Sequence, residues 1–213
     1  MFLNLPEEKI FQLDATLEDY ERLATTEDRR LYLTSAIESS DVESDGIYMS
    51  KCTQIVNDII SFNRLDAKSK TKKRKPIRLY INSPGGHIHE GFPVISAIEL
   101  SKTPVYTINI GEWCSMAFLI GITGHKRFSL PYMTFLMHDG SNFIFDSSSK
   151  VQDRVEFDRR FSEKIIKEHV LKHSKMTTGQ YDALSRVEYY MLPEDALTHG
   201  FIDEIVEDIN TIL

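Results

Sequence analysis

Between residues 77 and 138 the chain changes hydrophobic period repeatedly, and this alternation restricts the fold more than any other feature. Two β-branched, apolar runs, IRLYINS at 77–83 and PVYTINI at 104–110, flank GFPVISAIELS at 91–101, whose apolar residues have helical spacing. Strands that alternate with helices are typical of α/β proteins. The sequence therefore predicts an α/β fold with a mainly parallel sheet.

The rest of the chain continues this scheme without an internal repeat or a domain linker. We expect further strands over 30–34, 127–130, 133–138, 188–192 and 201–208, and further helices over 47–62, 111–124, 151–172, 180–186 and 193–200. A length of 213 residues suits one domain. We therefore expect an N-terminal segment at 1–28 and a single domain at 29–213.

Charge and hydropathy exclude several functional classes. With 25 basic and 32 acidic residues the net charge is −7, which makes general nucleic-acid binding a poor prospect. The basic stretch at 68–75 could form an anion patch, but no aromatic residues interleave it, which favours a solvated connector. No apolar stretch approaches the ~20 residues that cross a bilayer, and the acidic N-terminus is unlike a secretory signal. We expect a cytoplasmic protein with no membrane contact.

Candidate chemistry lies where predicted strands end, since sites in open α/β sheets gather there. Gly86 closes the SPGG turn after strand 77–83, and His138 ends strand 133–138. Ser115 stands at the start of a buried helix, where its own N–H and that of Met116 point outward unpaired. Each feature alone has an ordinary explanation, as a turn, a helix cap or a structural histidine. Together, a serine, a histidine and free N–H groups suit acyl transfer.

Other polar residues leave alternatives open. Cys114 is a rival nucleophile or a small buried filler. His169 and His173 have the i,i+4 spacing of a zinc site but lack a visible third ligand, so an exposed helix face is the simpler interpretation. His87 and His89 flank the glycine turn and could contact a substrate, although a polar loop explains them equally well.

Several motifs in a fixed order resemble the proteolytic subunit (ClpP) family of the ATP-dependent Clp protease over roughly residues 28–208. They are YINSPGG at 80–86, PVYTINIG at 104–111, the Ser115–Met116 pair, KRFSLP at 126–131, the Met137–His138 pair and ALTHGFIDEI at 196–205. The resemblance implies the ClpP/crotonase-type fold, a spiral of β-β-α units with an outlying handle helix at about 151–173.

The resemblance also implies roles for the candidate residues. Ser115 falls on the family's nucleophile, His138 on its general base, and the N–H groups of Gly86 and Met116 on its oxyanion hole. Glu188 falls where the family has the third triad residue, an Asp, with Asp182 as another possible partner of His138. The implied protein is a serine endopeptidase that cleaves unfolded polypeptides without a cofactor or metal. It would form a homo-oligomer of two stacked heptameric rings and work with an AAA+ unfoldase.

Some positions depart from the family. Asp139 and its successors replace a Gln-Pro pair and a Gly-rich stretch, Val187 replaces an Arg, and Ala117 replaces a Gly. These departures keep a second hypothesis open, a catalytically impaired ClpP-like assembly or regulatory subunit. A crotonase-type acyl-CoA enzyme is a third, but that chemistry usually relies on carboxylates rather than on a Ser–His pair. A viral prohead protease of ClpP type also remains possible.

Overall fold

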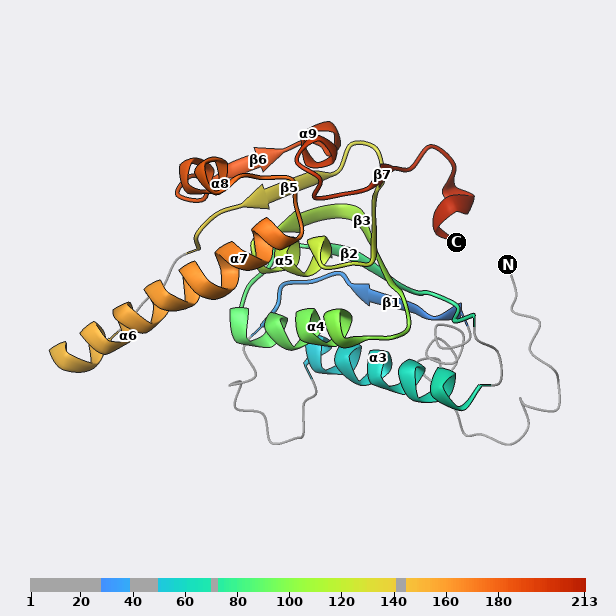
Figure 1. Ribbon diagram of the computed structural model, residues 1–213, viewed down its shortest axis with the longest axis horizontal. Helices are drawn as coiled ribbons and strands as arrows, with labels where there is room; N and C mark the ends of the chain where they lie inside the picture. Colours follow the sequence, from blue (N-terminus) through green and yellow to red (C-terminus); the bar gives the residue numbers. More distant parts are fainter. Residues whose placement is uncertain (1–27, 39–49, 70–72, 141–144) are drawn as a thin grey trace.

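The computed structural model describes residues 28–38, 50–69, 73–140 and 145–213 (Figure 1). Within them, one seven-stranded sheet has the order β1–β2–β3–β4–β7, with β5 paired to β3 and β6 paired to β5. The pairs are parallel except β5 with β6, which is antiparallel. The predicted α/β fold with a mainly parallel sheet is confirmed.

The strands fall where the apolar runs predict them. They are β1 (Arg30–Leu33), β2 (Ile77–Ser83), β3 (Val105–Cys114), β4 (Lys126–Ser129), β5 (Thr134–Met137), β6 (Tyr189–Met191) and β7 (Glu204–Ile205). The main difference is β3, which continues to Cys114 because its residues 112–114 pair with β5. The prediction of a helix over 111–124 is therefore wrong for its first four residues, and that helix, α5, spans Met116–Ile122.

The other helices of the described residues lie close to their expected positions. They are α3 (Lys51–Lys68), α4 (Ile88–Leu100), α6 (Ser148–Phe161), α7 (Lys167–Lys172), α8 (Thr178–Leu184) and α9 (Pro193–Thr198). A π-helical turn at Ser162–Ile166 joins α6 to α7, and a 3-10 helix at Ile209–Ile212 ends the chain. In the described part of the chain, no helix is long and apolar enough to cross a bilayer.

Several helix boundaries differ from the predictions. The helix expected to end near residue 62 continues to Lys68, so the basic stretch at 68–75 begins inside α3. The helix expected at 91–101 begins at Ile88. The predicted N-terminal segment at 1–28 lies outside the described residues except for Asp28, as do residues 47–49 and 70–72 of the other predictions.

The sheet buries apolar side chains on both faces. On one face, alternate residues of β2 (Ile77, Leu79 and Ile81) pack in the larger core with residues of α3, α4 and α5. On the other face, Tyr80 and Ile108 belong to a smaller cluster that includes Ile212 of the C-terminal 3-10 helix. The alternation along β2 follows from the two-residue period of a strand. The sheet is thus held on both sides, and its strand ends are fixed relative to one another.

The helix formed by α6, the π turn and α7 projects from the body of the molecule (Figure 1). No residue of α6 is buried, and Val155 and Phe157 on this helix are about half exposed. The helix occupies the position predicted for the handle at about 151–173, but it begins at Ser148.

Candidate active site

Ser115 occupies a strained position between β3 and α5. Its φ of 55° lies in the left-handed region, which is uncommon for a residue with a side chain. Its N–H donates to the carbonyl of Leu136 at 3.0 Å, so pairing with β5 continues up to the residue where the helix begins. The Ser115 hydroxyl has no hydrogen-bond partner among the described residues. Such strain is often kept at functional positions because the surrounding structure imposes it.

The glycine turn after β2 lies directly against Ser115. A Cβ atom on Gly85 would come within 2.9 Å of the Ser115 Cβ and 2.8 Å of the Met116 nitrogen. At Gly86, where φ is +138°, a Cβ would overlap the carbonyl of Ile37. These positions therefore require glycine, both for backbone conformation and for space.

Two backbone donors next to Ser115 are free. Ile37 bonds to the residues on either side of Gly86, since its N–H donates to the Gly85 carbonyl and its carbonyl accepts from the His87 N–H, both at 2.8 Å. The N–H of Gly86 itself, and that of Met116 in the first turn of α5, have no acceptor among the described residues. A pair of free donors beside a hydroxyl has the composition of an oxyanion hole.

His138 and Glu188 are brought together by the antiparallel pairing of β5 and β6. Met137 pairs with Tyr189 at the end of the ladder, so the residues just beyond, His138 and Glu188, leave the two strands at the same point. His138 Nδ1 lies 3.0 Å from Glu188 Oε1. Because a carboxylate only accepts, the ring donates from Nδ1 and carries its lone pair on Nε2. The other possible partner, Asp182, instead forms an ion pair with Lys167 at 2.6 Å.

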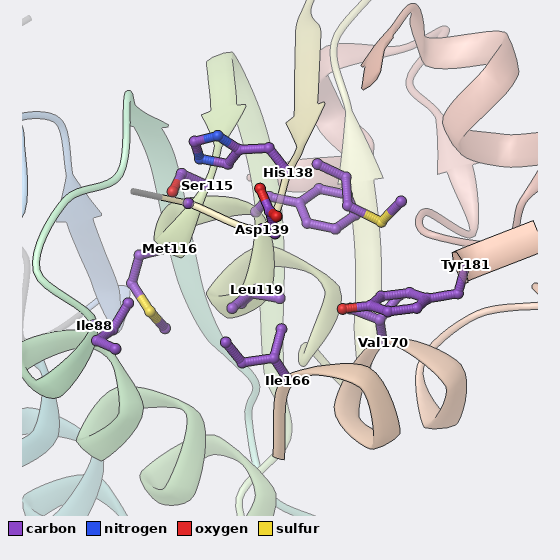
Figure 2. A pocket seen from close by; sticks show the side chains of 12 residues that line it. Ile88, Ser115, Met116, Leu119, His138, Asp139, Ile166, Val170 and Tyr181 are labelled. Atoms are coloured by element: carbon purple, nitrogen blue, oxygen red, sulfur yellow. The ribbon is translucent and has the colours of Figure 1, made fainter. Parts of the chain in front are cut away.

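The lone pair of His138 is unused in the described structure. Its Nε2 is buried and has no hydrogen-bond partner, so no bond to the Ser115 hydroxyl is formed. Both side chains nevertheless line one pocket, and Figure 2 shows them on the same rim. The structure therefore brings Ser115, His138, Glu188 and the two free N–H groups to one place, with the Ser115–His138 hydrogen bond absent.

The pocket beside Ser115 is largely apolar. Its apolar walls come from α4, α5, the π turn, α7, α8 and the end of β5, through Ile88, Met116, Phe118, Leu119, Met137, Ile166, Val170 and Tyr181. Figure 2 shows the Tyr181 ring on the side opposite Ile88. Burial raises the pKa of Tyr181 to about 12, so its hydroxyl stays neutral. Asp139 also lies on the lining, but a pocket whose walls are mostly apolar suits an apolar side chain.

Cys114, the alternative nucleophile, is poorly suited to that role. It is buried, and its Sγ lies 3.4 Å from Glu112 Oε2. Burial, followed by the nearby carboxylates of Glu112 and Glu188, raises the pKa of the thiol to about 12. Since the thiolate is the reactive form, the thiol is inert near neutral pH.

The structure also places a carboxylate beside His169 and His173. Glu99, at the end of α4, lies against both rings and offers the third ligand that was not visible in the sequence. The rings of His87 and His89 lie near the glycine turn, with centroids 5.5 Å apart and planes tilted by 59°.

A comparison with protein families bears on the whole arrangement. The sequence model of the family described as Clp protease matches residues 45–209, about three quarters of the chain. That span holds the glycine turn, Ser115, His138 and Glu188. The fold and this match agree, and the chain belongs to the Clp protease family.

Proposed function

We propose that the protein is a serine endopeptidase of the Clp type that hydrolyses peptide bonds of unfolded polypeptides. The observation that carries this proposal is the His138–Glu188 pair, at 3.0 Å, with a free and buried Nε2 on the pocket that Ser115 also lines. A base that is oriented by a carboxylate and has an unused lone pair beside a hydroxyl is suited to nucleophilic catalysis.

In the proposed reaction, Ser115 Oγ attacks the substrate carbonyl while His138 Nε2 accepts the hydroxyl proton. This step requires the hydroxyl to approach Nε2 to about 2.6–3.2 Å, a contact that forms on substrate binding. Nε2 then returns the proton to the leaving amine, and water hydrolyses the acyl-enzyme by the same path. The N–H groups of Gly86 and Met116 stabilise the oxyanion, and one such donor typically contributes ~100- to 1,000-fold in turnover.

The apolar pocket supports a preference for particular side chains of the substrate. Its apolar lining favours an aliphatic or aromatic side chain on the residue that precedes the scissile bond. Glu188 acts through His138 and is a positioning residue, since its contact is with the ring at 3.0 Å. The catalytic cycle uses no metal and no cofactor.

We further propose that the chain assembles into a cytoplasmic homo-oligomer of two stacked heptameric rings that receives polypeptides from an AAA+ unfoldase. Family membership supports this assembly, and so do large apolar side chains that an isolated subunit leaves in water. Among the described residues these include Leu100, Tyr132, Phe145, Phe157 and Tyr190. Exposed apolar patches mark interaction surfaces. The mass of the particle in native mass spectrometry tests the stoichiometry.

Labelling with a fluorophosphonate probe tests the chemistry. We expect the probe to modify the wild-type protein and a Cys114→Ala control at Ser115, as located by peptide mass spectrometry, and to leave Ser115→Ala unmodified. The Cys114→Ala control separates the two candidate nucleophiles. An assembled, correctly folded particle that takes up no probe would contradict the proposal.

A second candidate function is an assembly or regulatory subunit without peptidase activity. The missing hydrogen bond between Ser115 and His138 favours it, whereas the intact His138–Glu188 pair favours the enzyme. Cleavage of a fluorogenic peptide with an apolar residue before the scissile bond distinguishes the two functions. Turnover by the pure protein that disappears in Ser115→Ala supports the enzyme.

A further inference from the structure

Away from the candidate active site, a second group of histidines gathers around one carboxylate. Glu99 lies in the last turn of α4, and His169 and His173 lie one turn apart at the end of the handle. One ligand atom from each residue lies within 4.8 Å of the other two. Two imidazoles one helical turn apart and a carboxylate from a second helix make a donor set that suits a transition-metal ion.

The hydrogen bonds of His169 leave one of its ring nitrogens available. Its Nε2 lies 3.1 Å from the Leu119 carbonyl, which can only accept, so Nε2 carries the proton. Nδ1 therefore holds the lone pair, and it faces Glu99 Oε1 at 3.8 Å. In metal sites a ligating histidine commonly donates its other ring N–H to a backbone carbonyl in this way, which fixes the tautomer and the ring orientation.

The remaining contacts converge on the same carboxylate oxygen. His173 Nε2 lies 2.9 Å from Glu99 Oε1, and the Lys172 ammonium lies 2.7 Å from it. A positive charge therefore already occupies the space beside this oxygen. The Lys172 side chain is 62% exposed, so it can move into solvent when another cation takes its place.

The protonation states agree with ligand roles. Burial lowers the pKa of His169 to about 4, and burial also lowers the pKa of His173. For Glu99, burial acts to raise the pKa, but hydrogen bonds from Lys172 and His173 bring it below its ordinary value. A neutral imidazole and an ionised carboxylate are the forms in which these residue types bind a metal ion.

We propose that Glu99 Oε1, His169 Nδ1 and His173 Nε2 bind a divalent late first-row metal ion, with Zn²⁺ as the expected occupant. Binding replaces the hydrogen bond between His173 and Glu99, and the proton of the neutral His173 ring moves to Nδ1. A fourth position stays open for water, since three protein ligands leave tetrahedral Zn²⁺ one site short. The ion would join α4 to the base of the handle, which also carries the pocket residue Val170.

Calorimetric titration of the full-length protein with Zn²⁺ tests this proposal. We expect one ion per chain, and a loss of affinity of at least ~100-fold in Glu99→Gln and in His173→Ala. His89→Asn is the matched control, because His89 is exposed and lies in the first turn of α4, at the opposite end of that helix from Glu99, and it should bind Zn²⁺ as the wild type does. Saturating Zn²⁺ should raise the Tm of the wild type by roughly 5–10 °C. Circular dichroism verifies that each variant is folded.

Lys172→Met provides a test that does not remove a ligand. If the ammonium competes with the ion for Glu99, this variant should bind Zn²⁺ roughly 10-fold more tightly, because an opposing charge has gone. With Co²⁺ in place of Zn²⁺, visible d–d bands should appear in the wild type and vanish in Glu99→Gln. Absence of saturable binding, or equal binding by wild type and both ligand variants, would overturn the proposal. Ser115→Ala should bind Zn²⁺ normally, so failure of the peptidase proposal leaves this one standing.

Discussion

Two histidines of this protein, His138 and His169, each face a glutamate, but they use opposite ring nitrogens. His138 donates from Nδ1 to Glu188 at 3.0 Å and leaves Nε2 free at the pocket. His169 donates from Nε2 to the Leu119 carbonyl at 3.1 Å and leaves Nδ1 free toward Glu99. The same pair of residue types therefore leaves a free lone pair on the pocket that Ser115 also lines in one place, and one facing a carboxylate in the other.

The comparison indicates that the group accepting the ring N–H influences whether a histidine is suited to accept a proton or to bind a metal ion. The carboxylate behind His138 fixes the ring orientation and tautomer that the proposed general base needs. A neutral carbonyl behind the buried His169 gives less support to a charged ring, and burial lowers its pKa to about 4. A ring that stays neutral is a better metal ligand than a base.

The largest expected effect tests the His138 side of this comparison. His138→Gln removes the only proposed base beside Ser115, and we expect kcat for peptide cleavage to fall by ~10⁵- to 10⁶-fold. The control His125→Asn, an exposed histidine outside the site, should keep wild-type turnover. Turnover within tenfold of the wild type in His138→Gln would assign the base to another residue.

A second prediction concerns the thiol next to Ser115. Raising the pKa of Cys114 from its ordinary value of 9.0 to about 12 lowers the thiolate fraction at pH 8 by roughly 10³-fold. Burial likewise raises the pKa of Cys52 to about 11. We expect an aromatic disulfide reagent to modify the native protein at least ~100-fold more slowly than the urea-unfolded chain. Rapid modification of native Cys114 would restore it as a candidate nucleophile.

The third prediction concerns Glu188, whose carboxylate can be replaced by an uncharged amide of nearly the same shape. Glu188→Gln should lower kcat by about 10²- to 10⁴-fold with little change in KM, because the amide cannot stabilise a protonated ring. Glu188→Asp should recover much of this loss, since it restores the carboxylate. Asp182→Asn is the matched control, because Asp182 pairs with Lys167 instead. An equal loss in the Gln and Asp variants would indicate a structural rather than an electrostatic role.

The smallest effect is expected at Thr123, which lies against the ring of His169, and it concerns the free energy of unfolding. The Thr123 hydroxyl donates to the Leu119 carbonyl at 2.7 Å and lies 3.1 Å from His169 Nε2. Thr123→Val should lower the free energy of unfolding by about 1 kcal/mol in urea, the typical cost of one buried hydrogen bond. The exposed Thr198→Val should change it by less than about 0.5 kcal/mol. Equal effects at the two positions would show that the hydroxyl next to His169 contributes no special support.

Much of the fold could be predicted from the sequence because its signals are local. The β-branched run of β2 and the helical spacing of α4 are visible within a few residues. The continuation of β3 to Cys114 was not predictable, because it depends on pairing with β5, which follows later in the chain. The early start of α6 at Ser148 was missed because its first turn is polar and lacks an apolar period.

The candidate site was also predictable only in part. Motif order pointed to Ser115, His138 and Glu188, and the contact of Glu188 with His138 fits that prediction, while the catalytic roles stay predictions. The left-handed backbone of Ser115 and the unpaired Nε2 of His138 arise from tertiary geometry, which residue types do not show. Glu99 was missed for the same reason, since only the packing of α4 against the handle brings it to His169 and His173.

The sheet topology also has a consequence for the order in which the candidate site can form. Strand β3 is shared by β2, β4 and β5, and Glu188 reaches His138 only after β6 pairs with β5. Pairing between segments far apart in the chain is slow, because a long loop must close first. His138 and Glu188 are 50 positions apart in the chain, so their contact needs the closure of that whole segment. The orienting carboxylate therefore reaches the ring only once the sheet has formed as far as β6.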